Sequence, residues 1–275
     1  MGLPGLRMRV RDSDGSTMKN TITYAIGDVH GCFEKLIALL AHCDAHSGSR
    51  KPRFVFLGDY VDRGPDSKRV VEFLMRGQSK FPDRFICLKG NHEQLLVSAA
   101  RPTGFQEERD VWISNGGDRT LSSYQIDEPQ SMPPDATNWL GSLPTTFADT
   151  QRLFVHAGIF PGVPIELQEE DDLLWMREPF LSSQAEHGFL VVHGHTPTKN
   201  LKPDLRHNRL NLDTGACFGG PLTAAAFIDE ARVPAAFVFD DGQIGEVEAL
   251  DTKTARLEVI RRIAEARLKK SPGDE

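Results

Sequence analysis

Five short clusters of acidic, amide and imidazole side chains could perform chemistry, and each cluster follows an apolar run. They read GDVHG at 27–31, GDYVDRG at 58–64, GNHE at 90–93, HAG at 156–158 and HGHT at 193–196. Carboxylate oxygen, amide oxygen and imidazole nitrogen are ligands of borderline-hard divalent metal ions, and thiolates are absent from the set. The clusters therefore indicate a site for Mn, Fe or Zn and not a structural zinc finger.

The apolar runs before these clusters are typical of buried strands that deliver polar residues from their C-terminal ends. We expect strands at 21–26, 54–57, 85–88, 153–155, 189–192 and 210–212. Apolar residues at helical spacing follow the first two runs, over 33–40 and 70–74, the second after the capping candidates Asp66 and Ser67. This alternation predicts βαβ units.

Three later runs, at 223–228, 235–239 and 244–250, are separated by turn signals and predict an antiparallel second sheet. A last amphipathic helix is expected through Leu257, Ile260, Ala264 and Leu268. The whole pattern predicts an α/β fold of two packed mixed β-sheets flanked by helices. Residues 1–20 are expected to form a mobile leader, and 21–270 a single domain.

The composition narrows the class of protein. Of 275 residues, 39% are hydrophobic and 26% are charged, which excludes a disordered chain, a collagen and a coiled coil. A net charge of -7 disfavours binding to nucleic acid or to an anionic membrane. We find no membrane-length apolar run and no signal-peptide core, and Cys32, Cys43, Cys87 and Cys217 show no CxxC spacing. We therefore expect a cytoplasmic protein with reduced, mostly buried thiols.

The motifs GDVHG, GDYVDRG, GNHE, HAG and HGHT, in this order, resemble the signature of the phosphoprotein phosphatase (PPP) family of calcineurin-like metallophosphoesterases. The resemblance covers roughly 21–228. It implies an αββα sandwich, and a single metallophosphoesterase catalytic domain over 21–270. It also implies two divalent metal ions at the strand ends, with Mn favoured and Fe or Zn as alternatives.

The resemblance also implies a ligand set. Asp28 and His30 would hold the first metal ion, and Asp59 would bridge it to the second. Asn91, His156 and His195 would complete the second position. One carboxylate can bridge two cations that share an activated water, and the resulting hydroxide is the expected nucleophile.

The resemblance implies catalytic and phosphate-binding roles as well. His92 would protonate the leaving alkoxide, and Asp62 would orient its ring from behind. Arg63 and Asn91 would contact phosphate, and Arg177, in LLWMR at 173–177, resembles the second phosphate-binding arginine of the family. Guanidinium suits this role because its fork matches phosphate oxygens.

Several residues near the motifs are expected to stay outside the site. His193 is at most a support for a ligand, and Asp213 is expected to shape a turn. The three tryptophans, Trp112, Trp139 and Trp175, lie in apolar contexts that fit packing. We therefore expect no aromatic platform for a nucleobase.

One further segment of the chain bears on the class of substrate. WISNGG at 112–117 resembles the bacterial protein-phosphatase branch, and the length leaves little room for a nucleotide-binding insertion. We predict a serine/threonine protein phosphatase acting on phosphorylated proteins, with a symmetrical diadenosine tetraphosphatase as the alternative.

Two other functions are disfavoured. A phosphate-binding scaffold without turnover would typically lack the acid or a bridging ligand, whereas His92, Asp62 and every expected ligand are present. A nucleic-acid phosphodiesterase usually carries Gly-His-X-His, whereas His195 is followed by Thr196 and Pro197.

Overall fold

The larger sheet begins with three parallel strands. The chain leaves each of these strands through a loop at the same rim of the molecule. A computed structural model describes residues 20–103 and 105–247. Its first elements are β1 (Thr21–Ile26), α1 (Phe33–Ser47), β2 (Lys51–Phe56), α2 (Ser67–Lys80) and β3 (Phe85–Cys87). Strand β2 pairs in parallel with both β1 and β3. The βαβ units expected from the sequence are thus confirmed.

The three C-terminal strands belong to this same sheet. They are β9 (Thr223–Ile228), β10 (Ala236–Phe239) and β11 (Ile244–Glu246), and the order is β11-β10-β9-β1-β2-β3. The expectation that they form a second sheet is wrong, although their antiparallel pairing is confirmed. The physical reason is that β9 pairs with the free edge of β1, so β9–β11 extend the first sheet.

The smaller sheet is built from the middle of the chain. Its order is β4 (Thr146–Ala148), β5 (Arg152–Val155), β6 (Leu190–His193), β8 (Arg209–Asn211) and β7 (Asp204–Leu205). The three inner strands run parallel, and the two outer strands run antiparallel to their neighbours. Both sheets are therefore mixed, as predicted.

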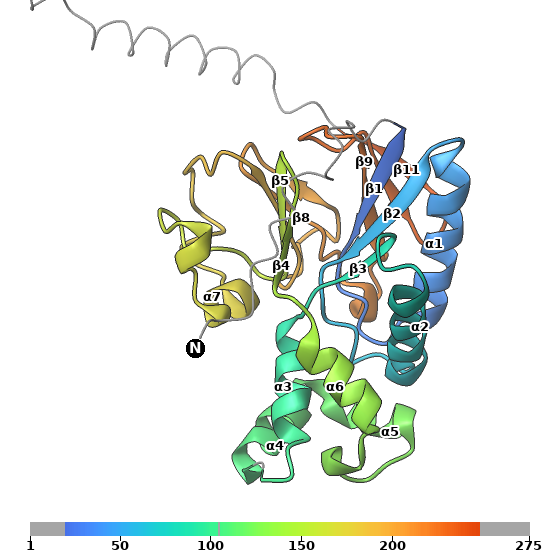
Figure 1. Cartoon of the computed structure of the whole chain (residues 1–275), viewed down its shortest axis with the longest axis vertical. Helices are drawn as coiled ribbons and strands as arrows, with labels where there is room; N and C mark the ends of the chain where they lie inside the picture. The colour runs from blue at the N-terminus through green and yellow to red at the C-terminus, as the bar shows by residue number, and fades with distance from the viewer. Residues whose placement is uncertain (1–19, 104, 248–275) are drawn as a thin grey trace, which may run out of the picture.

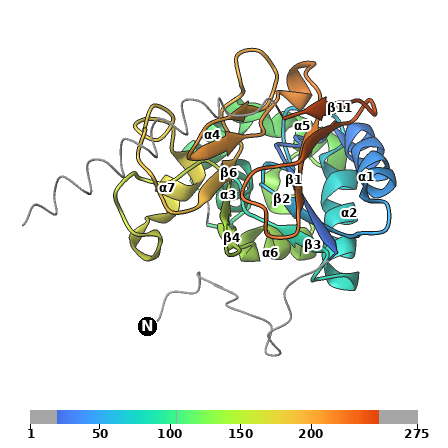
Figure 2. The ribbon, with the colours of Figure 1, turned by 90° about the horizontal axis from the view of Figure 1, so that it is seen from above.

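Alternating side chains place three apolar layers between the elements. Ala25 and Val55 face the smaller sheet, where they pack in one cluster with Phe154. The intervening residues Tyr24 and Phe54 pack in the cluster that includes the buried residues of α1 and α2. A third cluster joins β5 and β6 to the segment around α7 (Glu170–Trp175). The order is helices, sheet, sheet and helix, the expected αββα sandwich (Figures 1 and 2).

A group of helices forms the segment of the chain between β3, in the larger sheet, and β4, in the smaller sheet. It contains α3 (Asn91–Ala99), α4 (Gln106–Trp112), the π-helical turn η1 (Ile113–Gly117), α5 (Asp118–Tyr124), η2 (Pro129–Ser131) and α6 (Pro134–Ser142). These helices gather below the sheets in Figure 1, at the end toward which the first three strands run. Two 3₁₀ turns, η3 (Ile165–Leu167) and η4 (Ala216–Phe218), lie farther along the chain.

Two of the expected segments lie near the ends of the chain. The leader, apart from Asn20, and the helix through Leu257 and Leu268 lie outside the described residues. Among the described residues, no helix is both long enough and apolar enough to span a membrane. Cys43 and Cys87 are buried, Cys32 and Cys217 are half-buried, and all four thiols are free.

Candidate metal centre

The predicted ligands leave the strand ends on short loops with unusual backbone conformations. His30, Asp59 and His195 all have positive φ, at 43°, 53° and 68°. Asp62 and Arg63, on the loop after β2, also have positive φ, at 71° and 66°. Non-glycine residues in the left-handed region store strain, and such residues cluster at functional sites. Five predicted site residues thus share a conformation that surrounding contacts must maintain.

Glu93 supplies part of that support, although sequence reasoning gave it no role. Its Oε2 accepts hydrogen bonds from the backbone N–H groups of Asp59 and Gly90, both at 2.8 Å. Its Oε1 accepts one from the N–H of Tyr60, also at 2.8 Å. Burial raises the pKa of Glu93 to about 7, against the lowering effect of these three bonds. One buried carboxylate thus joins the loops after β2 and β3, and its place in GNHE was the available signal.

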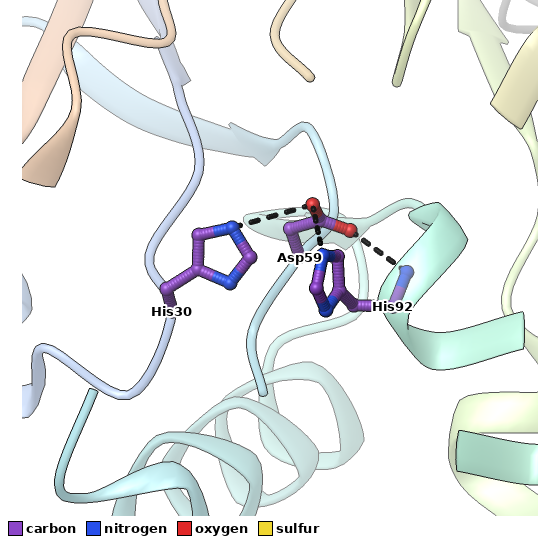
Figure 3. A group of neighbouring side chains, drawn as sticks. All are labelled: His30, Asp59 and His92. Atoms are coloured by element: carbon purple, nitrogen blue, oxygen red, sulfur yellow. Dashed lines mark hydrogen bonds and ion pairs between the residues drawn. The ribbon is translucent and has the colours of Figure 1, made fainter. Parts of the chain in front are cut away.

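Asp59 occupies the middle of the site. Its Oδ2 lies 3.5 Å from Nε2 of His30, and its Oδ1 lies 3.4 Å from Nε2 of His156. It belongs to two groups of potential metal ligands, one with His30 and His92 and the other with His156 and His195. Figure 3 shows the first group, with the Asp59 carboxylate between the two imidazoles. This geometry suits a carboxylate that bridges two cations.

The tautomers of two histidines leave a lone pair on each Nε2, and at His156 this lone pair faces another acceptor. Nδ1 of His30 donates to the carbonyl oxygen of Val61 at 2.8 Å, and Nδ1 of His156 donates to that of Leu57 at 2.9 Å. Each Nε2 must then be an acceptor. Nε2 of His156 nevertheless lies 2.8 Å from Oδ1 of Asn91. Facing acceptors of this kind are satisfied by a cation, so the residues fit a metal ion.

His195 completes the second group. Its Nδ1 lies 2.9 Å from Oδ1 of Asn91, and its buried Nε2 has no hydrogen-bond partner among the described residues. Burial, the neighbouring His156 and the Arg177 charge lower the pKa of His195 to about 2. Burial likewise lowers the pKa of His156 to about 3. Both imidazoles are therefore neutral, as metal ligation requires.

Asp28 is buried beside these ligands but belongs to neither group. Its two oxygens each lie 3.1 Å from the backbone N–H of His195, which donates to them. Burial raises the pKa of Asp28, and the nearby carboxylates of Asp213 and Asp59 raise it further. Asp213 itself accepts a hydrogen bond from the N–H of Gly215 at 3.1 Å, in keeping with its expected turn role. A bound cation would reduce the electrostatic repulsion among these carboxylates.

His92 and Asp62 form a buried pair next to the ligands. Nδ1 of His92 lies 2.7 Å from Oδ2 of Asp62, and Nε2 of His92 lies 3.9 Å from Oδ2 of Asp59. Burial raises the pKa of Asp62 to about 8. Burial and the Arg63 charge lower the pKa of His92 to about 3. Burial thus favours a neutral imidazole beside a protonated carboxyl group over an imidazolium beside a carboxylate.

Two predicted phosphate contacts border the centre. The Arg63 guanidinium donates from Nη1 to Nε2 of His30 at 2.6 Å, and its Cζ lies 5.5 Å from the ring centre of Phe218. Arg177 is exposed, and its charge acts on His195. The His193 ring packs against the Phe180 ring, with 5.1 Å between the ring centres.

The tryptophans differ from one another in their surroundings. Trp112 is buried, and its indole N–H donates to both oxygens of Asp62 at 3.0 Å. Trp175 is 37% exposed, with its ring edge-on to His195 at a centroid distance of 6.1 Å. The expectation that Trp175 only packs is therefore wrong. Its apolar neighbours Leu173, Leu174 and Met176 are buried, but the short helix α7 turns Trp175 outward.

Known proteins resemble most of this chain. The profile of the calcineurin-like phosphoesterase family matches residues 23–233. The chain belongs to the calcineurin-like phosphoesterase family. It is a hydrolase that acts on phosphate esters, and the resemblance to the PPP family is confirmed.

Three relatives illustrate the proteins that this chain is similar to. Serine/threonine-protein phosphatase 1 of Salmonella typhimurium is 29% identical over 212 residues, which cover 74% of this chain and 90% of the relative. The asymmetrical bis(5'-nucleosyl)-tetraphosphatase PrpE of Anoxybacillus flavithermus is 27% identical, covering 74% and 89%. The symmetrical bis(5'-nucleosyl)-tetraphosphatase of Escherichia coli is 31% identical, covering 70% and 63%.

Proposed function

We propose that this phosphoesterase is a metal-dependent phosphomonoesterase, and specifically a serine/threonine protein phosphatase. The observation that carries the proposal is the buried His92–Asp62 pair beside a carboxylate, Asp59, that faces histidines on both sides. This arrangement offers an acid for the leaving group next to a centre for two cations. Phosphorylated proteins are the proposed partners, and four free thiols support a cytoplasmic location.

Two divalent metal ions are proposed, with Mn favoured and Fe or Zn as alternatives. Asp28, His30 and Asp59 would hold the first ion, while Asp59, Asn91, His156 and His195 would hold the second. The convergence of acceptor atoms on Asp59 and Asn91 supports this set. Such ions make bound water acidic enough to supply hydroxide at neutral pH.

The chain's own residues would handle the proton and the phosphate. As the attacking hydroxide forms the new P–O bond, His92 would give the proton on Nε2 to the leaving oxygen, which keeps the electron pair of the broken P–O bond. The proton held between Asp62 and Nδ1 would pass to Nδ1, so the imidazole stays neutral. Asp62 would hold the opposite ring nitrogen through the contact at 2.7 Å. Arg63, Arg177 and Asn91 would orient the phosphoryl oxygens, and the two guanidiniums are suited to bidentate contacts.

A dinucleoside tetraphosphatase is the second candidate, in particular the symmetrical type. Two exposed aromatic rings border the centre and favour it: Trp175 beside His195, and Phe218 beside Arg63. Phe218 is 60% exposed. Nucleobases stack on such rings, with a gain of about 1–3 kcal/mol per base. Two of the three relatives carry this activity in their names.

Side-by-side kinetics with Mn present distinguish the two candidates. We expect phosphoserine and phosphothreonine peptides, and nitrophenyl phosphate, to have kcat/KM at least about tenfold above that of diadenosine tetraphosphate, roughly 1.4 kcal/mol. The nucleotide products are separated chromatographically. A clear preference for the dinucleotide, with ADP as product, would reverse the assignment.

A further inference from the structure

The carboxylate of Asp62 receives more hydrogen bonds than its pairing with His92 requires. The indole N–H of Trp112 donates to Oδ1 and Oδ2, both at 3.0 Å. The hydroxyl of Thr120 donates to Oδ1 at 2.7 Å and accepts from the backbone N–H of Asp62 at 2.9 Å. Asp62, Trp112 and Thr120 are all fully buried, so water does not compete for these bonds. Two neutral donors thus hold both oxygens of the carboxylate, in addition to the imidazole contact on Oδ2.

Both donors come from the helices between α3 and β4, here called the helical insertion (residues 106–142), and not from the strand-end loops or the start of α3, which carry the predicted metal ligands. Trp112 is the last residue of α4, and Thr120 lies in the first turn of α5. The π-helical turn η1 between them contains Gly117, whose backbone packs against the indole ring of Trp112. A Cβ added there would be 2.4 Å from Cε2 of Trp112. The absence of a side chain at Gly117 lets the indole reach the Asp62 carboxylate.

The same turn holds the loop on which Asp62 lies. The N–H of Arg63 donates to the carbonyl oxygen of Gly116 at 3.1 Å, and Gly116 has a φ of 99°. Asp62 and Arg63 both have positive φ, so they need outside contacts to keep their conformation. The insertion therefore fixes this loop through its backbone as well as through the carboxylate.

We infer that Trp112 and Thr120 are positioning residues for proton donation by His92, acting through Asp62. The inference rests on the proposed function, in which His92 protonates the leaving oxygen. A carboxylate that loses one donor can rotate about its Cβ–Cγ bond, and Oδ2 then no longer holds Nδ1 of His92 in line. The imidazole N–H is misdirected, while binding of the phosphoryl group is unaffected.

The test compares leaving groups that need a proton with leaving groups that do not. Trp112→Phe removes the indole N–H and keeps an aromatic ring. We expect kcat for a phosphoserine peptide to fall about tenfold, equivalent to about 1.4 kcal/mol. For 2,4-dinitrophenyl phosphate, whose leaving group departs as a stable anion, kcat should change less than about twofold. KM should stay unchanged for both substrates.

Trp139→Phe is the matched control. Trp139 lies in the same helical region, but its N–H donates to Oε1 of Gln78 at 2.7 Å and not to Asp62. This variant should treat both leaving groups alike. Thr120 provides a second test should Trp112→Phe not fold. Thr120→Val should reproduce the selective loss of kcat. Thr120→Ser, which keeps the hydroxyl group, should have wild-type activity on both substrates.

His92→Ala separates failure of the inference from failure of the proposed function. Equal losses for the two leaving groups in Trp112→Phe and Thr120→Val, with a selective loss in His92→Ala, would overturn the positioning role alone. Equal losses in His92→Ala as well would overturn the acid role and the inference together. A selective loss in all three variants supports both.

Discussion

Oδ1 of Asp59, on a loop of the larger sheet, lies 3.4 Å from Nε2 of His156, at the end of a strand in the smaller sheet. The candidate centre is therefore assembled across the interface between the two sheets. Its geometry depends on their packing as well as on each loop. Because the other oxygen of Asp59 faces His30, one carboxylate links both groups of ligands.

Replacing Asp59 should therefore remove both metal ions together. We expect Asp59→Asn to lower the metal content from about two ions per chain to well under one, since the shared anionic ligand is lost. Elemental analysis of the purified protein checks this. Asp110→Asn, which alters an exposed carboxylate on α4, is the control and should keep both ions. Retention of one full equivalent in Asp59→Asn would argue against a bridging role.

Removal of metal should abolish turnover, and Mn should restore it best. Oxygen and nitrogen ligands without thiolate form labile sites that exchange with ions in solution. The measurement is activity after exhaustive chelation, followed by titration with Mn, Fe, Zn and Mg in turn. Full turnover by the chelated enzyme would disprove a metal-dependent reaction, and better recovery with Zn or Fe would correct the preferred ion.

His92→Ala should lower kcat about 10² to 10⁴-fold for alkyl phosphates, the usual contribution of a general acid. The loss should shrink for nitrophenyl phosphate, because its leaving group needs little protonation. Metal content should stay nearly intact, which elemental analysis checks. Loss of metal on this substitution would instead make His92 a ligand, as its grouping with His30 and Asp59 permits.

The strand ends and their polar residues could be predicted because each motif directly follows an apolar run. The sheet to which β9–β11 belong could not, since the edge that a strand pairs with is decided by tertiary packing and not by its own alternation. The helical insertion that contains Trp112 and Thr120 was not predicted as helices either, because its segments are short and weakly periodic.

The candidate site, too, could be predicted from the sequence only in part. Asp59, Asn91, His156 and His195 converge as expected because their motifs are specific. The contrast between Trp112 and Trp175 could not be read from apolar neighbours. One indole is buried against Asp62 and the other is turned outward beside His195. Only the arrangement of the short helices that carry them decides which surface each ring faces.

An ion pair between the buried Arg152 and the half-buried Asp149 should control stability without affecting the reaction. Arg152 is 2% exposed, and its Nε lies 2.8 Å from Oδ2 of Asp149. Its guanidinium also lies over the ring of Phe227, at 4.6 Å from the ring centre. Asp149→Asn leaves this buried charge without its partner and should lower the free energy of unfolding by about 2–4 kcal/mol.

Denaturant unfolding of the metal-loaded protein measures that change. Arg206→Ala is the control, because Arg206 forms an exposed pair with Asp204 and surface pairs contribute about 0–1 kcal/mol. Activity per folded molecule should stay at the wild-type level in both variants. An Asp149→Asn protein as stable as the control variant would mean that the hydrogen bonds of Arg152 to Ala231 and Asp229 carbonyl oxygens suffice.

Arg177 provides the sharpest test of how the phosphoryl group is held. It is exposed, it follows the buried Met176 at the end of α7, and its positive charge acts on His195. A charge-assisted hydrogen bond to phosphate contributes about 1.5–3 kcal/mol. Arg177→Ala should therefore raise both the KM for a phosphopeptide and the inhibition constant of inorganic phosphate by about tenfold or more.

The pattern across variants identifies the contact. Arg177→Lys should recover only part of the affinity, because an ammonium group keeps the charge but lacks the planar fork that meets two phosphate oxygens. Arg76→Ala is the control, since Arg76 is an exposed side chain on α2 paired with Glu72. If Arg177→Ala left phosphate inhibition unchanged while raising the KM for the peptide alone, Arg177 would contact the polypeptide part of the substrate. Arg63 would then be the sole guanidinium on the phosphoryl group.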